Sequence, residues 1–158
     1  MSSIVVASIL GIWFLQGTLM FVDEFKYHHK RGLGLWERVG HPVDTLFFLA
    51  PFVYTQFFMG IEMFVLLCAM SCLIVTKDEF VHSAECEPAE HWLHSVLFIL
   101  HPVALFGLWF LWQNGLNQII LLQSIVIGLF MLYQIIYWNF LRVSPRPQLG
   151  VPHEASSK

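Results

Sequence analysis

Several apolar segments, each long enough to cross a lipid bilayer, constrain this chain more than any other feature. A helix rises about 1.5 Å per residue and the hydrocarbon core is about 30 Å thick, so about 20 apolar residues suffice to span it. Such runs occupy 3–22, 91–112 and 118–141, and a longer apolar region covers 41–76. The sequence therefore predicts an all-α integral membrane protein.

The overall composition agrees with this prediction. Hydrophobic residues make up 57% of the chain and charged residues 12%, whereas about a quarter of the residues in a soluble domain are charged. The first apolar run has neither a basic leader nor an A-x-A-like cleavage site, so we interpret it as a retained helix rather than a signal peptide.

The long apolar region has to be divided into two spans. A single helix over 42–76 would be about 52 Å long, which exceeds the thickness of a membrane core. Pro51, Gly60 and Glu62 offer places for a bend and a turn. We therefore expect five spans, at about 3–25, 36–57, 60–80, 88–113 and 117–142.

The basic residues predict an orientation for these five spans. All 8 Lys and Arg residues lie in the 23–40 loop, the 77–90 loop or the C-terminal segment, and these three segments fall on one side of the membrane. The positive-inside rule places that side in the cytoplasm. We expect an inner (cytoplasmic) membrane protein with its N-terminus outside and a disordered cytoplasmic tail at 143–158.

Ionisable residues recur in a pattern that predicts an internal repeat. The tripeptide Asp-Glu-Phe occurs at 23–25 and 78–80, and WERVGHPVDTLFF at 36–48 aligns with CEPAEHWLHSVLF at 86–98. A competing register pairs the His-Pro-Val segments at 41 and 101 but loses the matched carboxylates. We expect a single transmembrane domain over 1–142. Repeat 1 (about 3–57) and repeat 2 (about 60–113) would be two hairpins of a four-helix bundle, and 117–142 would be a peripheral fifth helix.

The repeated carboxylates and imidazoles have the spacing of one helix face. Residues four or seven apart on a helix lie on the same face, so these side chains would converge near one membrane boundary. Mixed carboxylate and imidazole groups suit iron, zinc and manganese. The sequence predicts two divalent metal ions, with iron favoured and zinc or manganese as alternatives. The candidate ligands are Glu24, His28, Glu37, His41, Asp44, Glu79, His82, Glu87, His91 and His94.

Other ionisable residues receive a different interpretation. Asp23, His29, Glu85 and Glu90 are expected to have ordinary solvated or hydrogen-bonded roles. For His101 three roles stay open: partner of a ligand, haem ligand or packed imidazole. Cys86 is an open candidate ligand, and Cys68 and Cys72 are interpreted as small packing residues.

The ligand pattern resembles that of the ferritin-like di-iron carboxylate proteins, in which Glu and Glu-x-x-His motifs come from paired helices. The resemblance covers the first four spans, but the spacing here is Glu-x-x-x-His, as at 24–28 and 37–41. It implies a di-iron oxidoreductase. A looser likeness to the histidine-rich membrane desaturases and hydroxylases lacks a full histidine box.

Four functions follow from these patterns, and no catalytic residue is assigned. The favoured one is a di-iron oxidoreductase that acts on a lipophilic, lipid-like or quinone-like substrate. The second is a zinc-dependent hydrolase in which Glu37 or Glu87 serves as general base. The third is not an enzyme but a metal sensor, a metal carrier or a structural metal protein, and the last is a haem protein that uses His41 with His91 or His101. The expected partners are membrane lipids, with homo-oligomer contacts through the fifth helix and no nucleic acid.

Overall fold

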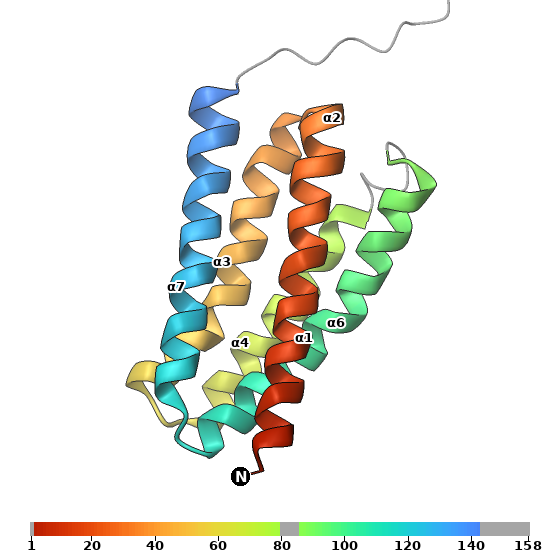
Figure 1. Ribbon diagram of the computed structural model, residues 1–158. Coiled ribbons are helices and arrows are strands. Elements are labelled where there is room, and N and C mark those ends of the chain that lie inside the picture. Colours follow the sequence, from red (N-terminus) through yellow and green to blue (C-terminus); the bar gives the residue numbers. More distant parts are fainter. Residues whose placement is uncertain (1, 80–85, 143–158) are drawn as a thin grey trace, which may run out of the picture.

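The structure, a computed structural model, describes residues 2–79 and 86–142, and every secondary-structure element in these ranges is helical (Figure 1). The predicted all-α architecture is therefore confirmed. Two helices continue through π-helical turns, and one continues through a 3-10 turn. The elements are α1 (Ser3–Val22), η1 (Asp23–His28), α2 (His29–Arg31), α3 (Leu35–Phe57), α4 (Ile61–Ile74), η2 (Val75–Asp78), α6 (Pro88–Gln113), α7 (Asn117–Ile136) and η3 (Tyr137–Leu141).

Three of these helices are long and apolar enough to cross a membrane, namely those over Ser3–Arg31, Pro88–Gln113 and Asn117–Leu141. Within the described ranges, α3 and α4 do not meet the same criteria. The α-helical part of α4 has 14 residues, about 21 Å, which is shorter than a bilayer core. Helix α3 carries charged residues along its first half. A location in a membrane is supported, whereas five full spans, the inner membrane and the orientation stay predictions.

The helices pack as a bundle in which α3 contacts both α4 and α7, and α1 contacts α6 (Figure 1). Trp13 of α1 shows how the core is tied together. Its indole Nε1 donates to the carbonyl oxygen of Ala104 at 3.1 Å, and its ring lies 5.3 Å from that of Phe52 on α3. Helix α7 lies along α3 and is an integral part of the bundle, where the sequence predicts a peripheral helix.

A proline in α3 explains one of the links to α7. Pro42 lies inside α3 and has no N–H, so the carbonyl oxygen of Arg38 cannot accept the usual helical hydrogen bond. The side-chain amide of Asn139 in η3 donates to this oxygen instead, at 3.3 Å. Asn139, just after the end of α7, therefore supplies the hydrogen-bond donor that the Arg38 carbonyl oxygen of α3 lacks within its own helix.

The positions that the predicted repeat matches have unlike surroundings. The side chain of Glu24 is 2% exposed and that of Glu79 43%, while Glu37 is 1% and Glu87 63% exposed. The two-hairpin repeat thus stays a prediction. His82, Glu85 and the predicted tail at 143–158 lie outside the described residues.

Candidate metal centre

The first two residues of the site come from a π-helical turn at the end of α1. A π-helix hydrogen-bonds residues five apart, and such turns are frequent at functional sites. In η1 this spacing brings Asp23 and His28 onto one face, with the His28 Nε2 atom 3.3 Å from an Asp23 carboxylate oxygen. A regular α-helix would favour Glu24 and His28, four residues apart, which is the pair that the sequence singles out.

The other two residues come from the first two turns of α6. This helix begins at Pro88, after Glu87 in extended conformation, as proline favours at a first helical position. Glu90 and His94 are then one turn apart, and both are buried. His94 Nε2 lies 2.9 Å from the second Asp23 oxygen, and His28 Nε2 lies 3.8 Å from a Glu90 oxygen.

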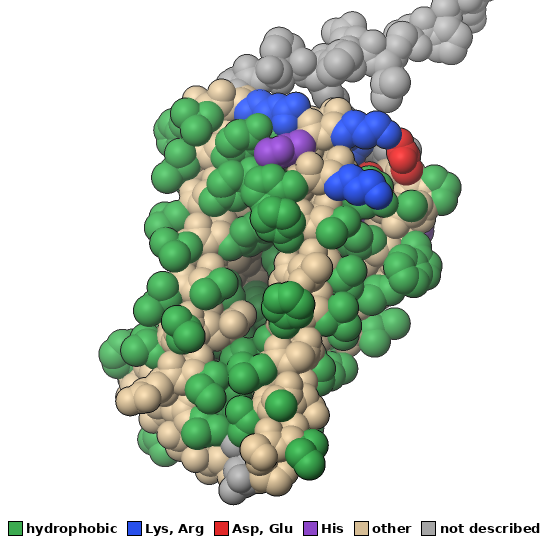
Figure 2. All heavy atoms as spheres, viewed as in Figure 1, with side chains coloured by type: hydrophobic (Ala, Val, Ile, Leu, Met, Phe, Trp, Pro, Cys, Tyr) green, Lys and Arg blue, Asp and Glu red, His purple; other side chains and the backbone are tan. Residues whose placement is uncertain are grey.

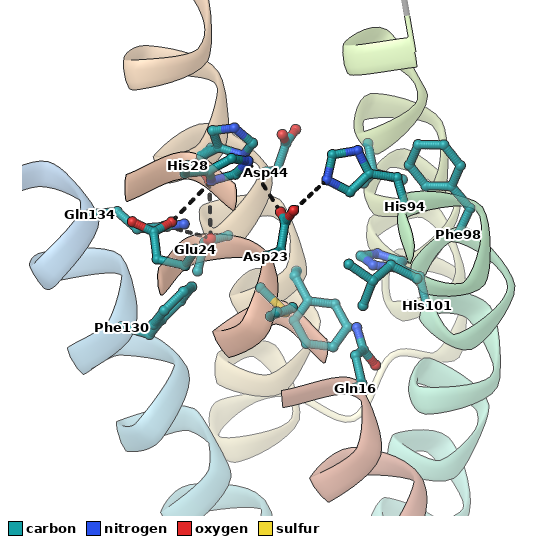
Figure 3. A pocket seen from close by; sticks show the side chains of 16 residues that line it. Gln16, Asp23, Glu24, His28, Asp44, His94, Phe98, His101, Phe130 and Gln134 are labelled. Atoms are coloured by element: carbon teal, nitrogen blue, oxygen red, sulfur yellow. Dashed lines mark hydrogen bonds and ion pairs between the residues drawn. The ribbon is translucent and has the colours of Figure 1, made fainter. Parts of the chain in front are cut away.

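Asp23, His28, Glu90 and His94 form a buried group that can hold a metal ion. Each offers one ligand atom, and the four atoms all lie within 4.8 Å of one another. Figure 3 shows Asp23 between His28 and His94. Two carboxylates and two imidazoles suit iron, zinc or manganese. We call these four residues the metal-ligand group.

Glu24 lies behind His28 rather than inside this group. Its Oε2 atom is 3.5 Å from His28 Nδ1, which leaves the opposite ring nitrogen directed at Asp23 and Glu90. The indole N–H of the buried Trp138 donates to the other oxygen of Glu24. A carboxylate that accepts from the far nitrogen of a ligating histidine fixes its tautomer and its orientation. Glu24 therefore has the geometry of a positioning residue.

His41 reaches the same region from α3. Its ring lies 4.6 Å from that of His28, and it lines the same small cavity of about 90 Å³ as Asp23, Glu24 and His94. Of the predicted ligands, the structure thus brings together Glu24, His28, His41 and His94.

Arg31 neutralises part of the negative charge at this end of the bundle. Its guanidinium donates to both oxygens of Glu37, at 3.0 and 2.6 Å, and to Glu90 at 3.1 Å. The N–H of Gly34 also donates to Glu37, at 3.1 Å. Gly32 ends α2 with a φ of 75°, a conformation suited to glycine, and so turns the chain toward Glu37. The predicted ligand Glu37 is therefore held by an arginine.

The remaining predicted ligands in the described ranges pair with other side chains. Asp44 lines the same small cavity as His41 but accepts from Lys77 at 2.6 Å, and Glu79 and Glu87 lie outside the lining of this cavity. Glu79 lies 2.7 Å from His91, and the exposed Glu87 lies 3.0 Å from Lys30. His101 also lines the cavity, and its Nε2 lies 2.8 Å from the Ser71 hydroxyl. Burial, with the nearby Glu90 carboxylate as a further cause, raises the pKa of the Cys86 thiol.

Asp23 and Glu90 are the two group members that the sequence interpretation assigns to ordinary roles. A signal for Glu90 exists, because Glu90 and His94 repeat the Glu-x-x-x-His spacing of 24–28 and 37–41. No comparable signal exists for Asp23, since its place in the group depends on the π turn. Comparisons of the chain with known protein families, with curated proteins and with solved structures gave no match.

Proposed function

We propose that this chain is a membrane-embedded metalloenzyme, a di-iron oxidoreductase that acts on a lipophilic substrate. The metal-ligand group carries this proposal. One ion would be held by Asp23, His28, Glu90 and His94, and His41, whose ring lies 4.6 Å from that of His28, would contribute a donor to a second ion. Bound iron would supply the redox chemistry with oxygen.

The charge at this site supports a bound cation. The carboxylates of Asp23, Glu24, Glu37 and Glu90 are all buried, and the Arg31 guanidinium supplies one positive charge to this set. Several buried anions close together are costly unless cations compensate them. Protonated imidazoles or metal ions would supply the remaining positive charge.

The surroundings of the site support a lipophilic substrate. The small cavity at the metal-ligand group shares Gln16, Met20, Thr45, Phe48 and Phe130 with a second cavity of about 510 Å³ that is mostly apolar. A substrate dissolved in the membrane could therefore approach without passing through water. The chain's own residues would bind the apolar part of this substrate and exclude water from the metal.

Metal analysis of the protein, purified without a histidine tag, tests the proposal. We expect iron in the wild type and a loss of most of it in His94→Ala. His91→Ala is the matched control, because His91 lies on the same helix but pairs with Glu79 at the half-exposed rim. Zinc in place of iron, or equal metal content in the two variants, would contradict the proposal.

The same measurement separates one ion from two. If His41 binds a second ion, His41→Ala should reduce the iron content from about two ions to about one per chain. A wild-type content of one ion that His41→Ala retains would refute the di-iron assignment and leave a mononuclear centre.

A further inference from the structure

A groove between α1 and α7 leads from the apolar surface to the metal centre. Figure 2 shows hydrophobic side chains around a hollow between these two helices. The cavity of about 510 Å³ is lined by residues of α1 and α7, with Thr45 and Phe48 of α3 also contributing. From Leu10 to Phe21 it follows α1 for about 16 Å. We call this cavity the α1/α7 groove.

One polar side chain marks the junction between this groove and the metal centre. Gln16 lines both cavities, and its side chain lies below those of Asp23 and His101 in Figure 3. Gln16 is 5% exposed, and its amide oxygen has no hydrogen-bond partner among the described residues. A buried polar atom of this kind costs free energy unless something bonds it. A ligand with a hydrogen-bond donor would satisfy it.

Polarity falls from the small cavity to the α1/α7 groove. Asp23, Glu24 and Gln134 line the small cavity, whereas the groove is lined mainly by apolar side chains such as Leu10, Phe14 and Val126, with Thr18 and Gln123 among its polar exceptions. A molecule with a small polar head at Gln16 and one long apolar tail in the groove matches this change. A phospholipid, with two tails and a bulky charged head, matches it poorly, because the small cavity of about 90 Å³ is lined by buried carboxylates.

We propose that the α1/α7 groove binds the hydrocarbon chain of a single-chain lipid substrate, with its polar head at Gln16 and the metal centre and its tail toward Leu10. This rests on the proposed function, because the groove would deliver the head of the substrate to the metal. It narrows the substrate class to fatty-alcohol-like molecules, because a neutral hydroxyl head can donate to the Gln16 amide oxygen, whereas the carboxylate of a fatty acid has no donor and would repel Asp23 and Glu24.

Two glycines of α1 allow a matched test. Gly17 lines the groove, and a Cβ atom added there would meet no atom within 4 Å. Gly11 lies on the same helix with equally open surroundings. It is absent from the lining of the α1/α7 groove. Gly17→Leu should fill the groove without displacing the fold, while Gly11→Leu adds the same side chain elsewhere.

The experiment uses a hexadecanol probe with a photoreactive diazirine at its tail end, added to the intact chain in phosphatidylcholine vesicles. We expect saturable labelling near Leu10 and Phe14 that unlabelled hexadecanol competes away. Gly17→Leu should reduce this labelling about tenfold, because its side chain displaces methylene groups of the probe. Gly17→Ala should reduce it less, and Gly11→Leu should label like the wild type.

Several results would overturn the proposal. These are labelling spread evenly over the lipid-facing surface, equal labelling of Gly17→Leu and Gly11→Leu, and competition by a quinone, by phospholipid or by palmitate but not by hexadecanol. Thermal unfolding of Gly17→Leu checks that the variant is folded, and Gly17→Ala provides the test if it is not. Metal analysis of the same samples keeps the two proposals apart. Specific labelling of a wild type that binds no metal would support the groove and refute the metalloenzyme.

Discussion

At the scale of single residues, His28 owes its position to a chain of contacts that reaches from α1 to the end of α7. Trp138 donates to Glu24, and Glu24 lies against the His28 Nδ1 atom. Such contacts behind a ligand typically affect metal affinity by about 10-fold to 100-fold. Trp138 is 1% exposed, so its indole N–H is held in place by packing.

We expect Trp138→Phe to weaken metal binding by about tenfold, because phenylalanine preserves an aromatic ring but removes the donor to Glu24. Metal titration of the chelated protein in detergent measures this. Trp92→Phe is the control, since Trp92 is largely exposed, and it should bind metal as the wild type does. Equal metal affinities in the two variants would show that the hydrogen bond from Trp138 to Glu24 does not help to position His28.

At the scale of elements, irregular helical turns position Asp23 and His28 and the residues that support them. The π turn η1 sets Asp23 beside His28, and the second π turn, η3, contains Trp138 and Asn139. Because Pro42 in α3 has no N–H, the Arg38 carbonyl oxygen accepts a hydrogen bond from Asn139 instead. These departures from regular α-helix occur where α1, α3 and α7 meet around the site.

Insertion of one alanine after Lys26 should abolish metal binding, because six positions then separate Asp23 from His28 and the two side chains no longer share a helix face. Lys26 is exposed, and Lys26→Ala keeps the length of the turn. We expect Lys26→Ala to retain full metal content and the insertion variant to lose it while circular dichroism still shows a helical protein. Full metal content in the insertion variant would exclude a role for the register of the π turn.

Asn139→Ala should lower the free energy of unfolding by about 1 to 3 kcal/mol, because the Arg38 carbonyl would lose its donor between packed helices. Asn114→Ala removes a similar side chain-to-backbone bond in the exposed turn after α6, and it should have a smaller effect. Urea or thermal unfolding in detergent gives both values. A larger loss for Asn114→Ala would contradict the link between α3 and α7.

At the scale of the whole molecule, the site lies where three long helices meet. Asp23 and His28 follow α1, Glu90 and His94 belong to α6, and Trp138 follows α7. A bound ion would therefore join segments that are distant in the chain. Binding to the folded state alone stabilises it in proportion to the logarithm of the free metal concentration.

Chelation should consequently lower the midpoint of thermal unfolding of the wild type. At a free metal concentration of about 100 times Kd, the bound ion would contribute about 2.7 kcal/mol. His94→Ala should show little change on chelation, because it already lacks a ligand, and His91→Ala should respond like the wild type. A wild type whose midpoint is unaffected by chelator and by added iron would argue against a structural contribution from the metal.

The amino-acid sequence by itself determined that this protein is helical, apolar and rich in paired carboxylates and imidazoles. Hydrophobic runs and the spacing of four residues between Glu and His are local properties, so they can be read without knowledge of packing. On that basis the sequence identified His28, His41 and His94 as candidate metal ligands. The Glu-x-x-x-His motif that contains Glu90 could be recognised in the same way.

Only the tertiary structure decided which of these groups meet. Which charged residues pair depends on their proximity in space. Arg31 donates to Glu37, Lys77 donates to Asp44, and His91 lies against Glu79. Asp23 enters the metal-ligand group through the π turn η1, and the other two members come from α6, which packs against α1. The role of Trp138 depends on α7, which packs along α3. No periodicity in the chain encodes these contacts, because each joins residues of different elements that only packing brings together.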